Sequence, residues 1–128
     1  MDEPQPASEP EIATILVCDD DPSLRELVRA VLGPRYRFVE AADGTEALQL
    51  ARELRPDLIV LDVMLPGLSG IEVLEEIRTD AVLRDLKVVV ITAWSHAEID
   101  AQVAGADRFV SKPFDPDDLS TAVEELLA

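Results

Sequence analysis

The chain has 128 residues, of which 48% are hydrophobic, and its formal net charge is −16. This length suits one domain with a substantial core. The negative charge argues against binding to nucleic acid or to anionic membranes, because both need clustered Lys and Arg. No apolar stretch approaches the roughly 20 residues of a membrane span. The single cysteine, Cys18, excludes an internal disulfide, and without a signal-peptide pattern a cytoplasmic location is expected.

Five apolar runs follow a polar N-terminal segment. Residues 1–11 are acidic and rich in proline, which predicts a disordered tail ahead of one domain at 12–128. Short runs of this kind are typical of strands buried on both faces. The predicted strands lie at 12–18, 36–41, 58–61, 87–91 and 107–111.

Helix-start signals precede an amphipathic segment after each run. Asp before Pro predicts an N-cap followed by the first helical residue, and an acid three residues after a capping residue predicts a capping box. The fourth predicted helix, at about 96–104, is the least apolar of the five. The signals are Asp21-Pro22, Asp43 with Glu46, Ser69 with Glu72, Ser95 with Glu98, and Asp115-Pro116.

Strands that alternate with helices predict an α/β fold with a doubly wound, five-stranded parallel sheet and helices on both faces. Ligands of such sheets bind beyond the carboxyl ends of the strands, and the flavodoxin-like order 2-1-3-4-5 places strands one and three side by side. Asp19-Asp20, Asp62, Thr92 and Lys112 end strands one, three, four and five, respectively. Because a charge inside a buried strand is costly, we expect Asp62 just past its strand.

These residue types suit phosphoryl transfer. Three carboxylates in one pocket repel each other unless a cation lies among them, and their hard oxygen ligands suit Mg²⁺. Lys112 supplies a positive charge and Thr92 a hydroxyl donor for phosphoryl oxygens. Asp62 can then act as the nucleophile and form an aspartyl-phosphate.

Four segments together resemble the receiver domain of bacterial two-component response regulators. They are residues 15–22, 61–70, 90–93 and 105–114, and the whole order of strands and helices matches as well. The resemblance implies a phosphorylation-dependent switch, with Asp62 as the phosphoacceptor for a histidine kinase or a histidine phosphotransfer protein. It also implies that the chain catalyses only its own phosphorylation and slow dephosphorylation.

The resemblance assigns further roles. Asp20 would be a direct Mg²⁺ ligand, Asp19 would act through water, and the main-chain carbonyl of Met64 would complete the protein ligands. Lys112 and Thr92 would contact the phosphoryl group, and the Lys112-Pro113 bond is expected to be cis. Phe109 occupies the aromatic switch position, which would relay the movement of Thr92 to a downstream protein on the face of helix four, strand five and helix five.

Three questions stay open at this stage. A haloacid-dehalogenase-type phosphatase is the alternative, because Asp19-x-Asp21 imitates its nucleophile motif, although Asp62 then has no role. Trp94, two residues past Thr92, could limit attack by water on the phosphorylated residue. Finally, the sequence does not decide between a stand-alone receiver and a fragment of a longer regulator.

Overall fold

The computed structural model describes residues 12–93, 100 and 105–128. Its strands are β1 (Thr14–Cys18), β2 (Arg37–Ala41), β3 (Leu58–Asp62), β4 (Lys87–Thr92) and β5 (Arg108–Ser111). Its helices are α1 (Pro22–Leu32), α2 (Gly44–Leu54), α3 (Gly70–Thr79) and α5 (Pro116–Leu127). The predicted tail, Trp94, the Ser95–Glu98 cap and all of the predicted helix at 96–104 except residue 100 lie outside the described residues.

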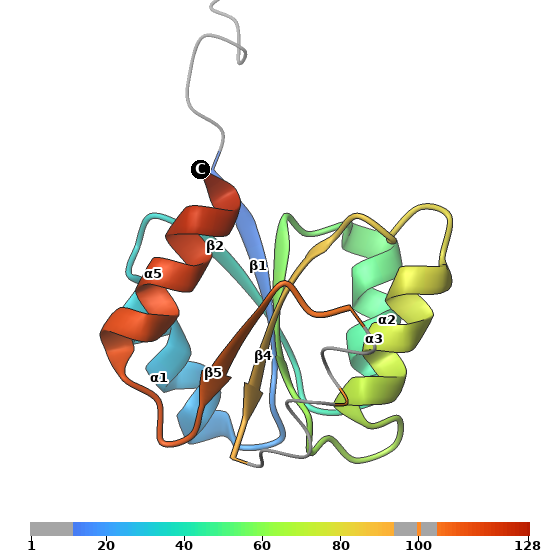
Figure 1. Ribbon diagram of the computed structural model, residues 1–128, viewed down its shortest axis with the longest axis horizontal. Helices are drawn as coiled ribbons and strands as arrows, with labels where there is room; N and C mark the ends of the chain where they lie inside the picture. The colour runs from blue at the N-terminus through green and yellow to red at the C-terminus, as the bar shows by residue number, and fades with distance from the viewer. Residues whose placement is uncertain (1–11, 94–99, 101–104) are drawn as a thin grey trace, which may run out of the picture.

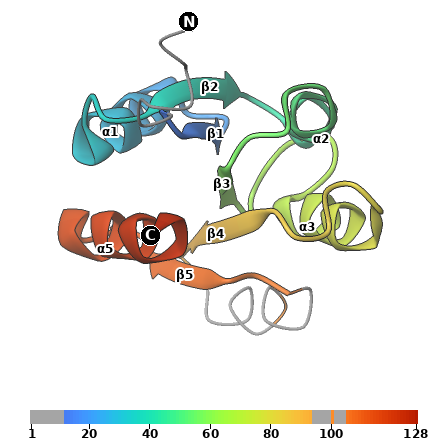
Figure 2. The ribbon, with the colours of Figure 1, turned by 90° about the horizontal axis from the view of Figure 1, so that it is seen from above.

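The five strands form one parallel sheet in the order β2-β1-β3-β4-β5, which confirms the predicted topology. β3 lies at the centre, and all five of its residues are buried. Helices α1 and α5 cover one face of the sheet, and α2 and α3 cover the other (Figure 2). The carboxyl ends of all the strands therefore meet at a single edge, toward which the arrowheads of β4 and β5 point (Figure 1).

Two apolar clusters fill the space between the sheet and its helices. Alternate residues of each strand point to opposite faces, so every strand contributes to both clusters. Leu16, Ile59 and Val90 belong to the cluster beneath α2 and α3. Ile15, Val60 and Val89 belong to the cluster beneath α1 and α5. This burial on both faces explains why the strands read as continuous apolar runs.

The predicted caps begin the described helices. Asp21 and Asp115 accept hydrogen bonds from backbone N–H groups two residues later, and each precedes a proline. Ser69 and Glu72 form a complete capping box at α3. The Asp43 side chain caps α2, but Glu46 accepts from the N–H of Ala42 and not from that of Asp43. The described helices thus start where the sequence signals place them.

The end of β3 differs from the sequence prediction. Asp62 is the last residue of the strand and pairs in register with Ile91, instead of lying beyond the strand. Its carboxylate is tolerated there because charged and polar groups surround it, as described below. Gly70 closes this end: its N–H donates to the Val63 carbonyl at 2.9 Å. An added Cβ would lie 2.2 Å from the Asp62 carbonyl oxygen, so only glycine allows this approach of α3.

Candidate functional site

The predicted polar residues gather at the carboxyl edge of the sheet. Asp19 directly follows β1, Asp62 and Thr92 end β3 and β4, and Lys112 directly follows β5. Asp19, Asp62 and Thr92 are buried, each at most 4% exposed. Buried carboxylates need hydrogen bonds or charge partners, so the contacts between these residues define the site.

Both carboxylate oxygens of Asp62 have a donor. The backbone N–H of Met64 donates to Asp62 Oδ1 at 3.0 Å. The Lys112 ammonium donates to Asp62 Oδ2 at 2.9 Å. The strand and the following turn thus fix the orientation of the carboxylate, and one oxygen faces a positive charge.

Lys112 lies between two carboxylates, because its Nζ is also 3.4 Å from Asp19 Oδ2. Burial lowers the pKa of the Lys112 ammonium, but the hydrogen bond to Asp62 and the charges of Asp62 and Asp19 outweigh that effect. The pKa therefore lies above its ordinary value, and Lys112 is protonated at neutral pH. The Lys112-Pro113 peptide is cis, as predicted.

The surroundings of Asp19 disfavour its charged form, whereas those of Lys112 favour the charged form of the lysine. Burial is the largest cause that raises the pKa of Asp19, and the neighbouring Asp62 carboxylate adds to it. The N–H of Asp21, which donates to Asp19 Oδ1 at 2.9 Å, and the charge of Lys112 counteract this only in part. The pKa of Asp19 is raised to about 6, so the site without a metal holds more negative charge than its surroundings readily stabilise.

A divalent cation would relieve this repulsion. Asp19, Asp20 and Asp62 each offer a carboxylate oxygen, and these oxygens all lie within 4.8 Å of one another. Asp20 is exposed, whereas the other two side chains are buried, so the cluster opens to solvent on one side. Such a set of hard oxygen donors fits Mg²⁺, which keeps several water ligands.

The remaining predicted residues lie nearby. Met64 is 58% exposed in the turn after β3. The carbonyl of Thr92 accepts from the Lys112 N–H at 2.9 Å, which joins the ends of β4 and β5. Phe109 is half-buried and packs against the cluster beneath α2 and α3. Their roles as metal ligand, phosphoryl contact and switch remain predictions.

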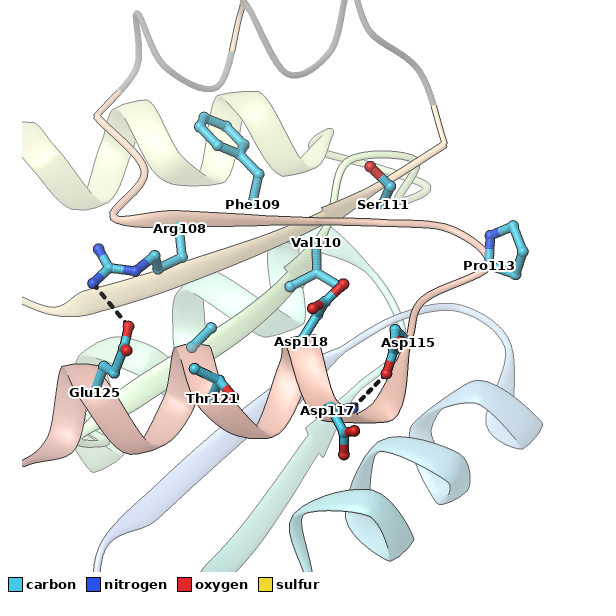
Figure 3. Close-up of a pocket in the computed structure, with 11 residues that line it drawn as sticks. Arg108, Phe109, Val110, Ser111, Pro113, Asp115, Asp117, Asp118, Thr121 and Glu125 are labelled. Carbon is cyan, nitrogen blue, oxygen red and sulfur yellow. Dashed lines mark hydrogen bonds and ion pairs between the residues drawn. The ribbon is translucent and has the colours of Figure 1, made fainter.

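A groove of about 490 Å³ runs between β5 and α5 (Figure 3). Phe109 points away from α5, whereas Val110 points toward it (Figure 3). The groove carries an ion pair between Arg108 and Glu125 at 3.4 Å. Its other charged side chains are acidic: Asp115, Asp117 and Asp118. β5 and α5 are the described part of the face that was predicted to bind a downstream protein.

Sequence reasoning missed two residues that shape the site. Arg25 on α1 donates from Nη1 to the carbonyl of Asp19 at 2.6 Å. Gly70, described above, lets α3 approach the backbone of Asp62. A positively charged residue one helical turn after an acidic run is a usable signal for the first, whereas the second depends on a close tertiary approach.

Fold and site together define a parallel α/β protein with a cluster of carboxylates around a lysine at the carboxyl edge of its sheet. The family model of the response regulator receiver domain matches residues 15–124. The chain therefore belongs to the response regulator receiver domain family, whose members are phosphorylation-dependent switches of two-component systems.

Relatives and solved structures agree with this assignment. The DNA-binding response regulator MtrA of Mycolicibacterium smegmatis is 43% identical over 117 residues, which cover 88% of this chain and 50% of MtrA. The response regulator Rre1 of Synechocystis sp. is 38% identical over 119 residues, covering 90% of this chain and 52% of Rre1. The chain thus spans about half the length of the curated relatives it matches.

Two solved structures show the same fold. A response regulator from Chloroflexus aurantiacus has a TM-score of 0.87 and 34% identity, covering 91% of this chain and 98% of its own. The chemotaxis response regulator CheY4 of Vibrio cholerae has a TM-score of 0.83 and 28% identity, covering 91% and 99%. These matches do not support the alternative of a haloacid-dehalogenase-type phosphatase. Asp21, the second acid of that motif, is exposed and caps α1.

Within the described residues, the structure contains no helix with the length and apolar character needed to cross a membrane.

Proposed function

We propose that Asp62 accepts a phosphoryl group from a histidine kinase or a histidine phosphotransfer protein. One observation carries this proposal: the buried Asp62 carboxylate faces the Lys112 ammonium at 2.9 Å inside a cluster of three carboxylates that opens to solvent. A carboxylate nucleophile is available there, a cation can bind beside it, and a fixed positive charge is present for phosphoryl oxygens.

In the proposed reaction, Asp62 Oδ attacks the phosphorus atom and forms an acyl phosphate. The bond from phosphorus to the donor imidazole nitrogen breaks, and that nitrogen keeps the electron pair. The Met64 N–H and Lys112 fix the carboxylate orientation beforehand. Lys112 holds its proton throughout, and the Thr92 hydroxyl donates to a phosphoryl oxygen.

Mg²⁺ is the proposed cofactor, held by Asp19, Asp20, Asp62 and the main-chain carbonyl of Met64. When bound, it neutralises phosphoryl charge in the way that other phosphoryl-transfer enzymes use it. Asp19 is suited to this role because burial and the neighbouring Asp62 carboxylate both disfavour its negative charge and raise its pKa. A bound cation would offset the repulsion between Asp19 and Asp62.

The chain acts on itself and does not turn over an external substrate. Asp62 is phosphorylated, and the resulting acyl phosphate is then slowly hydrolysed. Residues 12–128 form this receiver domain, and the cytoplasm is the compartment proposed for it. MtrA is named as DNA-binding, but this chain spans half of MtrA and carries a net charge of −16. We therefore propose a protein partner on the face that includes β5 and α5.

Lys112 provides the test, because the only other lysine, Lys87, is exposed at the start of β4 and gives a matched control. With a phosphorylated histidine donor and Mg²⁺, Lys112→Met is expected to slow phosphorylation roughly 10²-fold, as loss of a preorganised donor does elsewhere. Lys87→Met should match the wild type. A Lys112→Met rate equal to that of Lys87→Met would contradict the proposal.

A further inference from the structure

Arg25 makes two charge-assisted hydrogen bonds at the start of α1. Its Nη1 donates to the carbonyl oxygen of Asp19 at 2.6 Å. Its Nε donates to Glu40 Oε1 on β2 at 2.7 Å. The Arg25 side chain is only 15% exposed, so these bonds are partly shielded from water and stronger than surface pairs.

Arg25 completes the set of contacts that holds Asp19. The N–H of Asp19 donates to the Ala41 carbonyl at 3.1 Å, which ties the residue to β2. Asp19 Oδ1 accepts from the N–H of Asp21 at 2.9 Å. Arg25 binds the carbonyl, the remaining polar group of the Asp19 backbone. The backbone of Asp19 is therefore fixed on both sides.

The carbonyl that Arg25 binds belongs to the peptide that joins Asp19 to Asp20. A peptide unit is planar, so holding its carbonyl also fixes the direction in which the chain continues to Asp20. Asp20 is the exposed member of the carboxylate cluster and lacks the burial that fixes Asp19 and Asp62. Its placement beside the other two carboxylates thus depends on this peptide.

Glu40 in turn positions Arg25. It lies on β2, in register with Val17 of β1, two residues before Asp19. Glu40 also pairs with Arg29, one turn further along α1, through its second oxygen at 3.0 Å. Arg29 is 43% exposed and pairs with Glu40. Arg25 and Arg29 therefore share Glu40 as a partner, and Arg25 also reaches the Asp19 carbonyl.

We propose that Arg25 is a positioning residue for the Mg²⁺ site: held by Glu40, it binds the Asp19 carbonyl and so places the Asp19 and Asp20 carboxylates for the cation. Groups just outside a metal's ligands commonly change its affinity when they are removed. This inference rests on the proposed function, because it takes Asp19 and Asp20 as the groups that hold the cation.

The test measures binding of Mg²⁺ alone to the full chain by titration calorimetry. Arg25→Met removes both donors and is expected to raise the Kd for Mg²⁺ about tenfold. Arg25→Lys keeps the charge, but a single ammonium cannot reproduce the fork that reaches both partners, so the expected rise is a few-fold. Arg29→Met removes the same charge from the same helix and should leave the Kd within about twofold of the wild type.

A second readout separates positioning from general loss of structure. The Mg²⁺ concentration that gives half-maximal phosphorylation by a small acyl phosphate should rise by the same factor as the Kd. A merely destabilised protein would instead lose active molecules with no change in either value. Glu40→Gln leaves the Arg25 side chain in place and weakens its support, so its Kd should lie between those of the wild type and Arg25→Met.

An unchanged Kd in a folded Arg25→Met protein would overturn the inference, as would an equal effect of Arg29→Met. If Arg25→Met does not fold, Arg25→Lys decides in the same way: a raised Kd supports the inference and an unchanged one overturns it. Failure of the proposed function gives a different result, because the wild type itself would then show no Mg²⁺-dependent phosphorylation of Asp62.

Discussion

At the scale of single residues, the site contains more negative than positive charge. Two buried carboxylates, Asp19 and Asp62, share the ammonium of Lys112, which is closer to Asp62 than to Asp19. Burial and the Asp62 charge raise the pKa of Asp19 to about 6 from the 3.8 of an unperturbed group. Folding therefore takes up a proton between these two values, and the contribution of Asp19 to stability decreases as the pH rises through this range.

Asp19→Asn tests this sign. The amide keeps an oxygen acceptor for the Asp21 N–H but cannot ionise. Without divalent metal and near neutral pH, the variant should be more stable than the wild type by roughly 1–2 kcal/mol. The difference should become small below about pH 4, where Asp19 is protonated in both states. Urea unfolding at both pH values measures it; a variant that is less stable near neutral pH would contradict the assigned repulsion.

Which site residues the sequence predicts depends on how each residue acts. Asp62, Asp19 and Lys112 are predictable because each follows or ends an apolar run, and a parallel sheet brings such ends together. Arg25 is harder to predict: its position one helical turn after an acidic run is a signal, but its guanidinium binds a backbone carbonyl, and the Asp19 side chain gives no sign of a partner for that oxygen. The sequence also does not predict that Asp62 belongs to β3, because a buried charge is tolerated there only through neighbouring residues from other strands.

At the scale of elements, the contact between α3 and β3 positions Asp62. The first residue of α3 is Gly70, where an added Cβ would lie 2.2 Å from the Asp62 carbonyl oxygen and 2.7 Å from Val63 Cα. Both atoms belong to the backbone, so relief requires a shift of the strand end. The sequence predicts where α3 starts, from its capping box, but not how closely it approaches the strand.

Gly70→Ala should destabilise the fold by roughly 1–3 kcal/mol, as overpacking does in protein cores. Intrinsic helix propensity alone would favour Ala by about 1 kcal/mol, so the expected sign is opposite to the one that propensity predicts. Urea unfolding compares the variant with Ser69→Ala, which loses only the cap of the same helix at about 1 kcal/mol. The account of this contact would be wrong if Gly70→Ala equalled or exceeded the wild type in stability.

At the scale of the whole molecule, the order β2-β1-β3-β4-β5 creates the site. It makes β1 and β3 neighbours, so that Asp19 and Asp62 come together although they lie 43 positions apart in the sequence. The alternation of strands and helices predicts a parallel sheet with helices on both faces. The order of its strands is predicted from the flavodoxin-like precedent, which the structure confirms. The least apolar predicted helix, at 96–104, falls outside the described residues except for residue 100, so that part of the partner face stays a prediction.

The central claim is that Asp62, at the carboxyl edge of the sheet, is the carboxylate that accepts a phosphoryl group. It is tested most directly by treating the chain with a small acyl phosphate and Mg²⁺ and locating the added phosphoryl group by peptide mass spectrometry. The account predicts one phosphoryl group per chain, on Asp62, absent in Asp62→Asn and retained in Asp21→Asn, where the amide can still cap α1. A phosphoryl group found on Asp19, or one that persists in Asp62→Asn, would contradict it.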